Sequence, residues 1–413
     1  MQTHLAPQYQ NTPEGQQAEA ILRKCVHCGF CTATCPTYQL LGDELDGPRG
    51  RIYLIKQVLE GQQPTRKTQL HLDRCLTCRN CESTCPSGVQ YGHLVDIGRK
   101  IVDEQVPRPA GEKAVRWALK EGLPSPLFAP AMKLGQAVRG LLPASLKNKV
   151  PQGRAAGTWP TREHTRKMLM LEGCVQPAMA PSINAATARV LDACGIQSVI
   201  APEAGCCGAV KFHLNDQAGG LEQMRRNIDA WWPLVEAGVE AIVMNASGCG
   251  VTVKEYGHHL QHDGAYAAKA ERISALTRDL SQLLPELVAQ LKGRIAPPSG
   301  ASLAYHPPCT LQHGQQLKGG VEQHLAELGF DIATARVEPH LCCGSAGTYS
   351  VLQPQIAYEL RDRKLGHLSQ LQPQTIVSAN IGCITHLQSG TSTPVRHWVE
   401  VLDEALDQAL AAS

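Results

Sequence analysis

The sequence has little that would indicate an exported or membrane-spanning protein. No run of about 18 apolar residues occurs, which is the length that a helix needs to cross a bilayer. The first 17 residues are polar and lack the basic and then apolar order of a secretory signal, so we expect no export. The 39 Lys and Arg balance 37 Asp and Glu, and the net charge of +2 gives no reason to expect a nucleic-acid partner.

The sequence also lacks a glycine-rich loop for a dinucleotide or other phosphate-bearing cofactor. No G-x-G-x-x-G motif follows a predicted strand, and the glycines of 344–347 do not have that spacing. Aromatic residues are scarce as well, with 5 Trp, 9 Tyr and 4 Phe in 413 residues. A chain of this length predicts two to three domains with a sizeable apolar core.

Cysteine, in contrast, is abundant, with 17 residues. Thiols stay reduced in a chain that is not exported, and a long chain does not need disulfides to fold. This density therefore indicates metal or redox chemistry. Eight of the cysteines lie between Cys25 and Cys85, and eight more form two sets of four. Cys194 stands alone, and we expect it to be a small buried hydrophobic residue.

The eight N-terminal cysteines form two runs with the spacing C-x2-C-x2-C-x3-C-P, which begin at Cys25 and Cys75. This spacing is typical of paired [4Fe–4S] clusters, in which the fourth Cys of each run binds the other cluster. Structural zinc usually uses two C-x2-C pairs and is disfavoured here. We therefore predict one cluster on Cys25, Cys28, Cys31 and Cys85, and a second on Cys75, Cys78, Cys81 and Cys35.

A basic segment between the two runs contains Arg49 and Arg51. Two guanidinium groups near the clusters would offset the negative charge of the thiolates. A solvated helix start at Pro48 is an equally good interpretation. Helical apolar spacing in this region predicts helices over 16–24, 48–60 and 93–102.

The C-terminal part of the chain is duplicated. Cysteines of the two halves correspond at offsets of 135, 136, 136 and 134 residues, and each half contains a Cys-Cys-Gly motif. Each copy is predicted to run strand, helix, strand, Cys-Cys-Gly turn, long helix, apolar strand and Gly-Cys turn. Alternating strands and helices indicate an α/β domain with a parallel sheet, whose strand ends carry the cysteines.

These patterns predict an α+β multi-domain protein. We expect a mostly helical two-cluster ferredoxin-like domain, followed by the duplicated α/β Cys-Cys-Gly domain with parallel strands. The predicted boundaries are 13–104 for the ferredoxin-like domain, 105–165 for a basic Pro-rich connector, and 166–295 and 300–410 for the two Cys-Cys-Gly domains.

The connector region is the one part of the chain with a strong charge bias. Residues 105–167 contain 12 Lys and Arg against 3 Asp and Glu, a local charge of +9, with two short helices predicted near 112–121 and 131–142. Basic residues interleaved with apolar ones suit a helix that lies on an anionic membrane. We predict peripheral attachment to the cytoplasmic side of the inner membrane; a connector that docks partner subunits, or is merely solvated, is the alternative.

Taken together, these motifs resemble one known family over nearly the whole chain. The paired runs, the segment DELDGPRGR at 43–51, and the motifs AGCCGA at 204–209 and HLCCGS at 340–345 are similar to the iron–sulfur subunit of bacterial glycolate oxidase. The resemblance implies that partner subunits use flavin (FAD) to oxidise glycolate to glyoxylate. This subunit would relay the electrons through two [4Fe–4S] clusters towards membrane quinone.

The missing cofactor loop agrees with this division of labour, since a chain without a hydride acceptor cannot oxidise a hydroxy acid by itself. We therefore expect this chain to act in an oxidase or dehydrogenase complex and not alone. Subunits of lactate and glycerol-3-phosphate systems are similar, so a D-lactate-oxidising complex is the first alternative. A heterodisulfide-reductase-like thiol or quinone reductase is the second, and a scaffold whose metals only hold loops is the third.

The Cys-Cys-Gly domains offer four thiols each and define a further candidate Fe–S or metal site. These residues are Cys174, Cys206, Cys207, Cys249, Cys309, Cys342, Cys343 and Cys383. Similar modules in heterodisulfide reductases carry another Cys three residues after the last one, where this chain has Thr252 and His386. The Cys383-x-x-His386 spacing suits a metal, and His306, His313 and His340 also flank the second set. Thiols buried only for packing are the alternative.

A third group of candidate ligands, His258, His259 and His262, lies in a polar stretch of the first Cys-Cys-Gly domain. We expect these three imidazoles to lie at the surface and not to bind metal.

Overall fold

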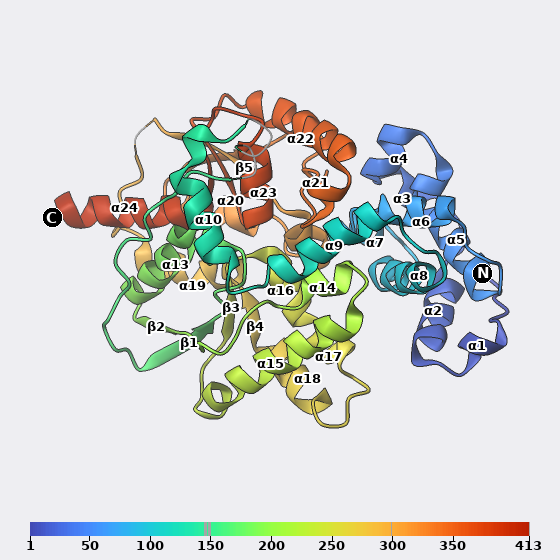
Figure 1. Ribbon diagram of the computed structural model, residues 1–413. Helices are drawn as coiled ribbons and strands as arrows, with labels where there is room; N and C mark the ends of the chain where they lie inside the picture. The colour runs from blue at the N-terminus through green and yellow to red at the C-terminus, as the bar shows by residue number, and fades with distance from the viewer. Residues whose placement is uncertain (144–146, 148–149, 299, 413) are drawn as a thin grey trace.

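The computed structural model describes residues 1–143, 147, 150–298 and 300–412, with side chains described as far as residue 409. Lys149 of the basic segment and four other residues of the predicted connector lie outside the described residues. Figure 1 shows a helical N-terminal domain on one side of the molecule and two α/β units on the other. No helix in the described part of the chain is long and apolar enough to cross a membrane.

The N-terminal domain is built from short helices around the cysteine loops. Its elements are α1 (Pro7–Gln10), α2 (Pro13–Lys24), α3 (Phe30–Ala33), α4 (Pro36–Leu41), η1 (Glu44–Asp46), α5 (Pro48–Leu59), α6 (Arg66–Asp73), α7 (Asn80–Ser83) and α8 (Tyr91–Gln105). The helices predicted from apolar spacing are confirmed as α2, α5 and α8. Pro48 is the first residue of α5, where its missing N–H costs nothing.

The two cysteine loops have the same unusual backbone. His27 and Gly29 in the first loop, and Thr77 and Arg79 in the second, all have positive φ angles between 53° and 85°. Left-handed residues of this kind curl a short loop and turn successive N–H groups towards one side, which suits an anionic ligand. The loops lie close together, because the Asn80 side chain donates a hydrogen bond to the Thr34 carbonyl across them (3.0 Å).

Two helices follow in the segment predicted to be a connector. These are α9 (Ala110–Gly122) and α10 (Phe128–Ala137), with a short 3₁₀ turn η2 (Arg139–Leu141). Neither α9 nor α10 has a buried residue. Both helices therefore lie on the outside of the protein.

Each Cys-Cys-Gly domain contains a four-stranded parallel sheet. The first comprises β1 (Arg166–Met170), α12 (Gln176–Met179), α13 (Pro181–Ala193), β2 (Ile196–Val199), α14 (Ala209–His213), α15 (Gln217–Glu236), β3 (Ile242–Met244), α16 (Ser247–Lys254), α17 (Tyr256–His259), α18 (Ala267–Leu276), β4 (Thr277–Asp279), η3 (Leu280–Leu283) and α19 (Leu284–Leu291). The second comprises β5 (Ser302–His306), the π-helical turn η4 (Thr310–Gly314), α20 (Gly320–Glu327), β6 (Asp331–Thr334), α21 (Tyr349–Leu352), α22 (Pro354–Ser369), β7 (Thr375–Ser378), α23 (Ile381–Gln388), β8 (Val395–His397) and α24 (Trp398–Ala412).

The strand orders, β2-β1-β3-β4 and β6-β5-β7-β8, are the same, as duplication requires. The register pairs Leu169 with Ile242 in one sheet and Ala304 with Ile376 in the other. These buried apolar strands confirm the predicted parallel sheets. The fourth strand of each sheet, β4 or β8, was not predicted, because a strand of three residues has too few positions to show a pattern.

The Gly-Cys turns predicted after the third strand are wrong in detail. Cys249 lies in the first turn of helix α16, and Cys383 lies in the first turn of α23. Apolar residues after each Gly-Cys pair continue a helical pattern, so the turn is only the one or two residues that precede it. The cysteines still lie at the carboxyl ends of their strands, as predicted.

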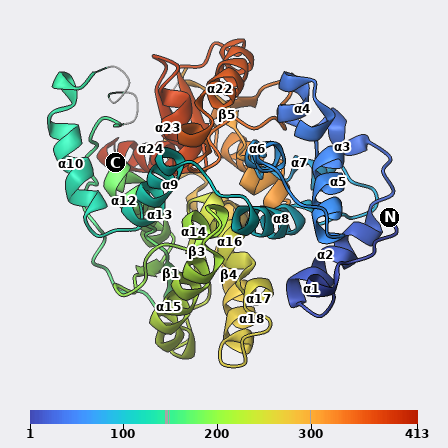
Figure 2. The same ribbon diagram turned by 45° about the vertical axis from the view of Figure 1, so that its right-hand side comes forward.

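The two α/β domains share one hydrophobic core. Helix α13 of the first packs along α24 of the second, next to one another in Figures 1 and 2. Ile183, Leu191 and Cys194 belong to the same buried cluster as Trp398 and Leu402. The prediction that Cys194 is a buried hydrophobic residue is confirmed, since it is 4% exposed.

The N-terminal domain packs against both α/β domains through polar and ring contacts. The imidazole of His93 on α8 lies 4.1 Å from that of His258 and 6.1 Å from that of His259, measured between ring centroids. Burial lowers the pKa of His93 and of His259 to about 4, so both are neutral at pH 7. The expectation that these histidines lie at the surface holds for His262, which is exposed, whereas His258 and His259 are half-buried against α8.

The glycine of each Cys-Cys-Gly motif is required by the backbone. Gly344 has a φ angle of 86°, and a Cβ added there would lie 2.3 Å from the Ala357 carbonyl oxygen of α22. Gly208 in the first copy has a φ angle of 99° and would meet the Gly220 carbonyl oxygen at 2.8 Å. The missing side chain lets the cysteine turn lie directly against the following helix.

We therefore predict that Gly344→Ala destabilises the protein by about 2–5 kcal/mol, from left-handed strain of ~1–2 kcal/mol and a steric clash of ~1–3 kcal/mol. Urea unfolding of the full chain would measure the change. Gly366→Ala is the control, because Gly366 lies within α22 with nothing within 4 Å of an added Cβ. It should stabilise by about 0.5–1 kcal/mol. Equal stabilities of the two variants would contradict this account of the motif.

Candidate functional site

Five N-terminal thiols line one cavity near the surface. The cysteines in its wall are those predicted for the first cluster, Cys25, Cys28, Cys31 and Cys85, together with Cys81. Most of the remaining wall is apolar and includes Val26, Phe30 and Ile52. Cys28 is exposed at the rim, whereas Cys25 is buried.

A second cavity lies deeper and is lined by the other predicted set. Its cysteines are Cys35, Cys75, Cys78 and Cys81. Arg51 and Tyr91 complete the wall, and the Tyr91 hydroxyl lies 3.6 Å from the Cys75 sulfur. Each cavity thus combines three thiols of one run with the fourth of the other run, which is the grouping that crossed ligation requires. Cys81 contributes to both walls, so the two cavities are adjacent.

The electrostatics of these thiols suit a bound cation. Burial, and then the neighbouring Cys25, raise the pKa of Cys31 to about 11. Burial raises the pKa of Cys78 and of Cys81 well above the usual value. Thiolates, the ligand form, are therefore disfavoured at neutral pH unless positive charge accompanies them. Iron supplies that charge, so the predicted set of four thiols at each cavity fits a [4Fe–4S] cluster.

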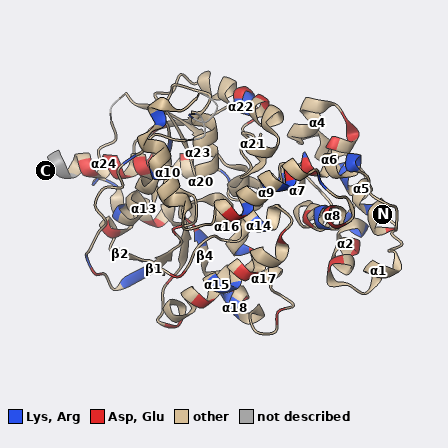
Figure 3. Cartoon of the chain, in the orientation of Figure 1, with Lys and Arg blue, Asp and Glu red and all other residues tan. Residues whose placement is uncertain are grey.

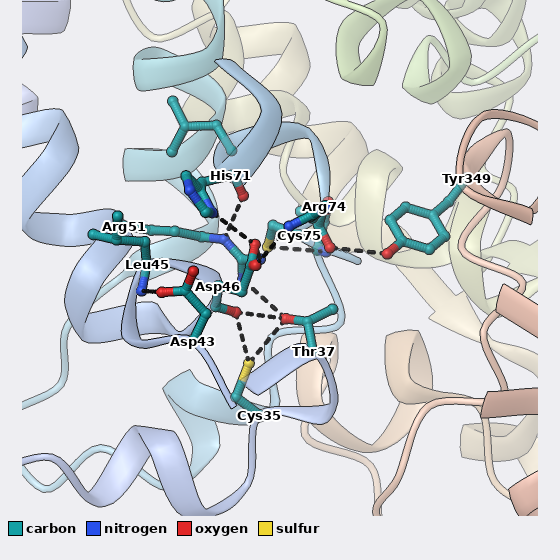
Figure 4. Close-up of polar contacts among 12 residues, drawn as sticks. Cys35, Thr37, Asp43, Leu45, Asp46, Arg51, His71, Arg74, Cys75 and Tyr349 are labelled. Atoms are coloured by element: carbon teal, nitrogen blue, oxygen red, sulfur yellow. Dashed lines mark hydrogen bonds and ion pairs between the residues drawn. The ribbon is translucent and has the colours of Figure 1, made fainter. Parts of the chain in front are cut away.

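A buried ion pair connects the two cysteine runs beside the second cavity (Figure 4). Arg51 is 1% exposed and pairs with the fully buried Asp46 at 3.4 Å. The Arg51 guanidinium also donates to the Thr37 hydroxyl (3.1 Å) and to the His71 carbonyl (2.7 Å). Thr37 lies just after Cys35 and contacts its sulfur at 3.3 Å. Of the two arginines predicted near the clusters, Arg51 is thus a buried cation beside the second cavity, whereas Arg49 lines the first cavity, is 41% exposed and pairs with Glu44 at 2.6 Å.

Asp46 has two further polar partners. Arg74 pairs with it at 2.8 Å, and the His71 ring lies 3.1 Å from it. Burial alone would lower the pKa of Arg51, but the Cys75 thiol and Asp46 raise it, so the guanidinium stays charged. A permanent positive charge beside this cavity favours the more reduced state of a cluster held there.

The second Cys-Cys-Gly domain closes over the second cavity. Cys78 packs in one apolar cluster with Cys309, Cys342 and Leu341. The Tyr349 hydroxyl donates to the Arg74 carbonyl at 2.9 Å, and Ser83 bonds His313 at 2.8 Å. Arg74 is the residue before Cys75, so the C-terminal half of the chain holds the second cysteine loop directly.

In the first Cys-Cys-Gly domain the four predicted thiols come together. Cys174 follows β1, Cys206 and Cys207 follow β2, and Cys249 lies after β3. The Cys174 thiol contacts Cys206, and Cys207 contacts both Cys206 and Cys249. Hydrogen bonds from the Cys174 and Cys207 thiols, and then from backbone N–H groups, lower the pKa of Cys206. This thiol is therefore the most acidic of the set.

In the second domain the thiols form the same series, and a histidine joins them. Cys309 and Cys342 lie 3.6 Å apart between sulfurs, and Cys343 contacts both Cys342 and Cys383. His306, at the end of β5, has a ring nitrogen within 4.8 Å of the Cys343 and Cys383 sulfurs. Burial lowers the pKa of His306 well below its usual value, so its imidazole is neutral.

His386, predicted as the histidine ligand from its spacing to Cys383, does not join this group. Its Nε2 lies 3.0 Å from the Ala357 carbonyl oxygen. One helical turn separates the two residues on α23, but the side chain is directed towards α22. Among the described residues, the compact donor group around Cys383 contains His306 instead. His306 precedes Cys309 by three residues, and only the end of strand β5 brings it to Cys383.

Several basic side chains of the connector form ion pairs within the protein, so fewer of them can bind a membrane or a partner than the sequence indicates. Arg116 pairs with Asp73 at 3.1 Å, and Arg108 pairs with the same carboxylate at 2.6 Å. Lys120 pairs with Asp216 at 3.1 Å. Acidic and basic residues are intermixed over the helices in Figure 3. The local excess of +9 is therefore partly neutralised by the neighbouring domains.

Comparison with known proteins agrees with this architecture. Residues 21–89 match the 4Fe-4S dicluster domain family, and residues 168–254 and 303–388 each match the cysteine-rich domain family. The glycolate oxidase iron-sulfur subunit of Escherichia coli (strain K12) is 54% identical over 410 residues, which covers 99% of this chain and 100% of that protein. The probable glycolate oxidase iron-sulfur subunit of Bacillus subtilis (strain 168) is 30% identical and covers 93% of this chain and 92% of its own length.

More distant relatives match only part of the chain. Lactate utilization protein A of Geobacillus kaustophilus is 26% identical over 57% of this chain and 98% of its own length. Iron–sulfur and cysteine-rich domains in this arrangement, with near full-length identity of 54%, establish the family and a role in electron transfer. This chain belongs to the family of glycolate oxidase iron–sulfur subunits.

Proposed function

We propose that the chain relays electrons from flavin-containing partner subunits towards quinone while those partners oxidise glycolate to glyoxylate. The observation that supports this proposal is the pair of adjacent cavities, each lined by three thiols of one run and the fourth Cys of the other, with Cys81 in both walls. A [4Fe–4S] cluster, when bound, takes up and releases single electrons. The residues of the chain position two such clusters side by side.

The surroundings of the cavities differ, which supports a direction for the relay. Val26 and Phe30 at the first cavity are 69% and 61% exposed, and Cys28 is exposed beside them. Large apolar side chains exposed together are typical of a contact surface. We place the contact with a redox partner at this rim. The second cavity is covered by the second Cys-Cys-Gly domain, whose Cys309 and Leu341 pack against Cys78.

The substrate assignment rests on the relatives. The closely similar Escherichia coli protein is named for glycolate oxidase, whereas the lactate utilization proteins correspond to little more than half of this chain. The flavin belongs to the partners in this proposal, and substrate chemistry is theirs. D-Lactate remains the alternative substrate, and a thiol or quinone reductase remains the alternative activity.

The relay predicts a separation by electron acceptor. Partner flavin subunits without this chain should still reduce a small dye with glycolate but should fail to reduce quinone. Adding the chain with both clusters should restore quinone reduction, because a protein path for single electrons is then present. Quinone reduction at the normal rate without the chain would contradict the proposal. Disulfide reduction by the isolated chain would favour the alternative activity.

Crossed ligation makes a prediction that can be tested in the purified chain. We expect about eight irons per chain for the two N-terminal clusters. Cys85→Ser should give the same EPR spectrum as Cys31→Ser, and a different one from Cys78→Ser, since Cys85 and Cys31 line the same cavity. The control Cys194→Ser should leave iron and EPR unchanged. If Cys85→Ser instead resembles Cys78→Ser, each run holds its own cluster.

We also propose that the complex attaches peripherally to the cytoplasmic side of the inner membrane through the connector helices. Exposed apolar residues support this proposal more than charge does: Trp117 is 65%, Leu127 74%, Leu134 67% and Leu141 88% exposed. Lys113 and Lys133 are exposed among them. A surface of this composition suits either an anionic bilayer or the partner subunits.

The attachment should therefore depend on both kinds of residue. Changing Trp117, Leu127 and Leu134 to Gln should move the complex to the soluble fraction. Washing membranes with 1 M salt should do the same, because the Debye length, over which charges attract each other, is then only ~3 Å. Val351→Gln is the control, as an apolar residue that is 41% exposed elsewhere. A triple variant that stays on the membrane with normal cluster content would show that other surfaces provide the attachment.

A further inference from the structure

His306 is a buried imidazole without a hydrogen-bond partner. It is 1% exposed, and neither Nδ1 nor Nε2 has a partner among the described residues. A buried polar group left unpaired costs about 1–3 kcal/mol, so nearly all such groups in folded proteins are satisfied. We therefore expect a ligand to bind a ring nitrogen of His306 at the end of β5.

The nearest polar atoms are two thiols, and they are arranged compactly. A His306 ring nitrogen, Cys343 Sγ and Cys383 Sγ all lie within 4.8 Å of one another, and both cysteines are at most 4% exposed. The thiol of Cys342 contacts that of Cys343 and offers a fourth donor. With zinc–sulfur bonds of ~2.3 Å, tetrahedral coordination places two thiolates ~3.8 Å apart. The three donors of the compact group need only small movements to reach one ion, and Cys342 would have to turn towards it from its contact with Cys343.

Compact donor groups of this kind are rare in the described part of the chain. The only other one joins Asp43, Asp46 and His71, where Arg51 and Arg74 already pair with Asp46. The thiols around the two N-terminal cavities form no such group, in keeping with clusters that use a separate iron for each thiolate. The thiols of the second Cys-Cys-Gly domain are therefore spaced for a single ion, unlike those of the ferredoxin-like domain.

The duplicated domain provides an internal comparison. At the offset of 135 residues, His306 corresponds to Leu171, which is 4% exposed in the first copy. The same place in the sheet thus holds an apolar side chain in one domain and an imidazole in the other. A leucine would satisfy the packing of the second copy as well, so packing does not account for the histidine.

A buried cation lies beside the same thiols. Lys364 is 1% exposed, and its ammonium group donates to the Glu338 carbonyl at 2.6 Å. It interacts electrostatically with Cys343, Cys342 and Cys309. Three thiolates and one neutral imidazole around a divalent ion have a net charge of −1, which one lysine offsets.

We propose that the second Cys-Cys-Gly domain binds one zinc ion through His306, Cys343, Cys383 and Cys342. Three thiolates and an imidazole are a common donor set for closed, structural zinc sites. Zinc has no redox chemistry, so this site lies outside the electron path and its existence does not depend on the proposed relay. It fixes the ends of β5, β6 and β7 where Cys342 packs near Cys78 of the second cavity.

Metal analysis of the full chain tests the site. The chain is purified without oxygen, loaded with Zn²⁺ and passed over a chelating resin, and zinc and iron are then counted. We expect about one zinc per chain in the wild type and in His386→Gln, whose imidazole faces the Ala357 carbonyl. His306→Leu, which installs the residue of the first copy, and Cys383→Ser should retain less than a tenth as much, with iron unchanged at about eight.

A second measurement is independent of the variants' folding. Replacement by Co²⁺ in the wild-type chain should give intense thiolate-to-cobalt absorption bands with the d–d bands of a tetrahedral site. Zinc below a tenth per chain after loading, undiminished zinc in a folded His306→Leu chain, or about four extra irons that disappear with His306→Leu would each overturn the proposal. None of these outcomes alters the dye and quinone test of the relay.

Discussion

The buried ion pair between Asp46 and Arg51 is the contact on which the electron-transfer site depends. The Arg51 guanidinium donates to Thr37, two residues after the fourth cysteine of the first run, and to the carbonyl of His71, four residues before the second run. The two runs are 40 residues apart in sequence, and this one side chain holds them at a single cavity. Removing one partner of a buried ion pair typically costs ~3–5 kcal/mol, because the other charge is left uncompensated. Asp46 and Arg51 therefore determine where the cysteines meet.

Residues that contact this ion pair also connect it to other parts of the chain. Arg74, bound to Asp46, offers its carbonyl to Tyr349 of the second Cys-Cys-Gly domain. Arg99 of α8 adds hydrogen bonds to the carbonyls of Leu72 and Cys75 on the other side of the loop. The second cavity is consequently enclosed by three parts of the chain, while the first remains open at Cys28. One enclosed and one open cavity thus lie side by side, which suits the proposed relay.

The duplicated half shows how one fold can carry two different sites. Both copies use the same strand order and the same left-handed glycine to bring four thiols to the strand ends. The copies then differ in single residues: His306 faces the thiols of the second, where Leu171 stands in the first. In the first, the Cys206 thiol instead accepts hydrogen bonds from its neighbours. Shared backbone geometry thus sets where the thiols lie, and individual side chains set what they can bind.

The sequence alone determined the features that depend on local spacing. The two C-x2-C-x2-C-x3-C-P runs, the duplication and the parallel sheets could all be predicted, because spacing and periodicity are properties of neighbouring residues. Tertiary structure decided which distant residues meet. It brought His306 and not His386 to Cys383, covered His258 and His259 with α8, and paired Arg108 and Arg116 of the connector with Asp73. These contacts join residues that are up to about 165 positions apart, and their energies depend on burial and orientation, which no local pattern records.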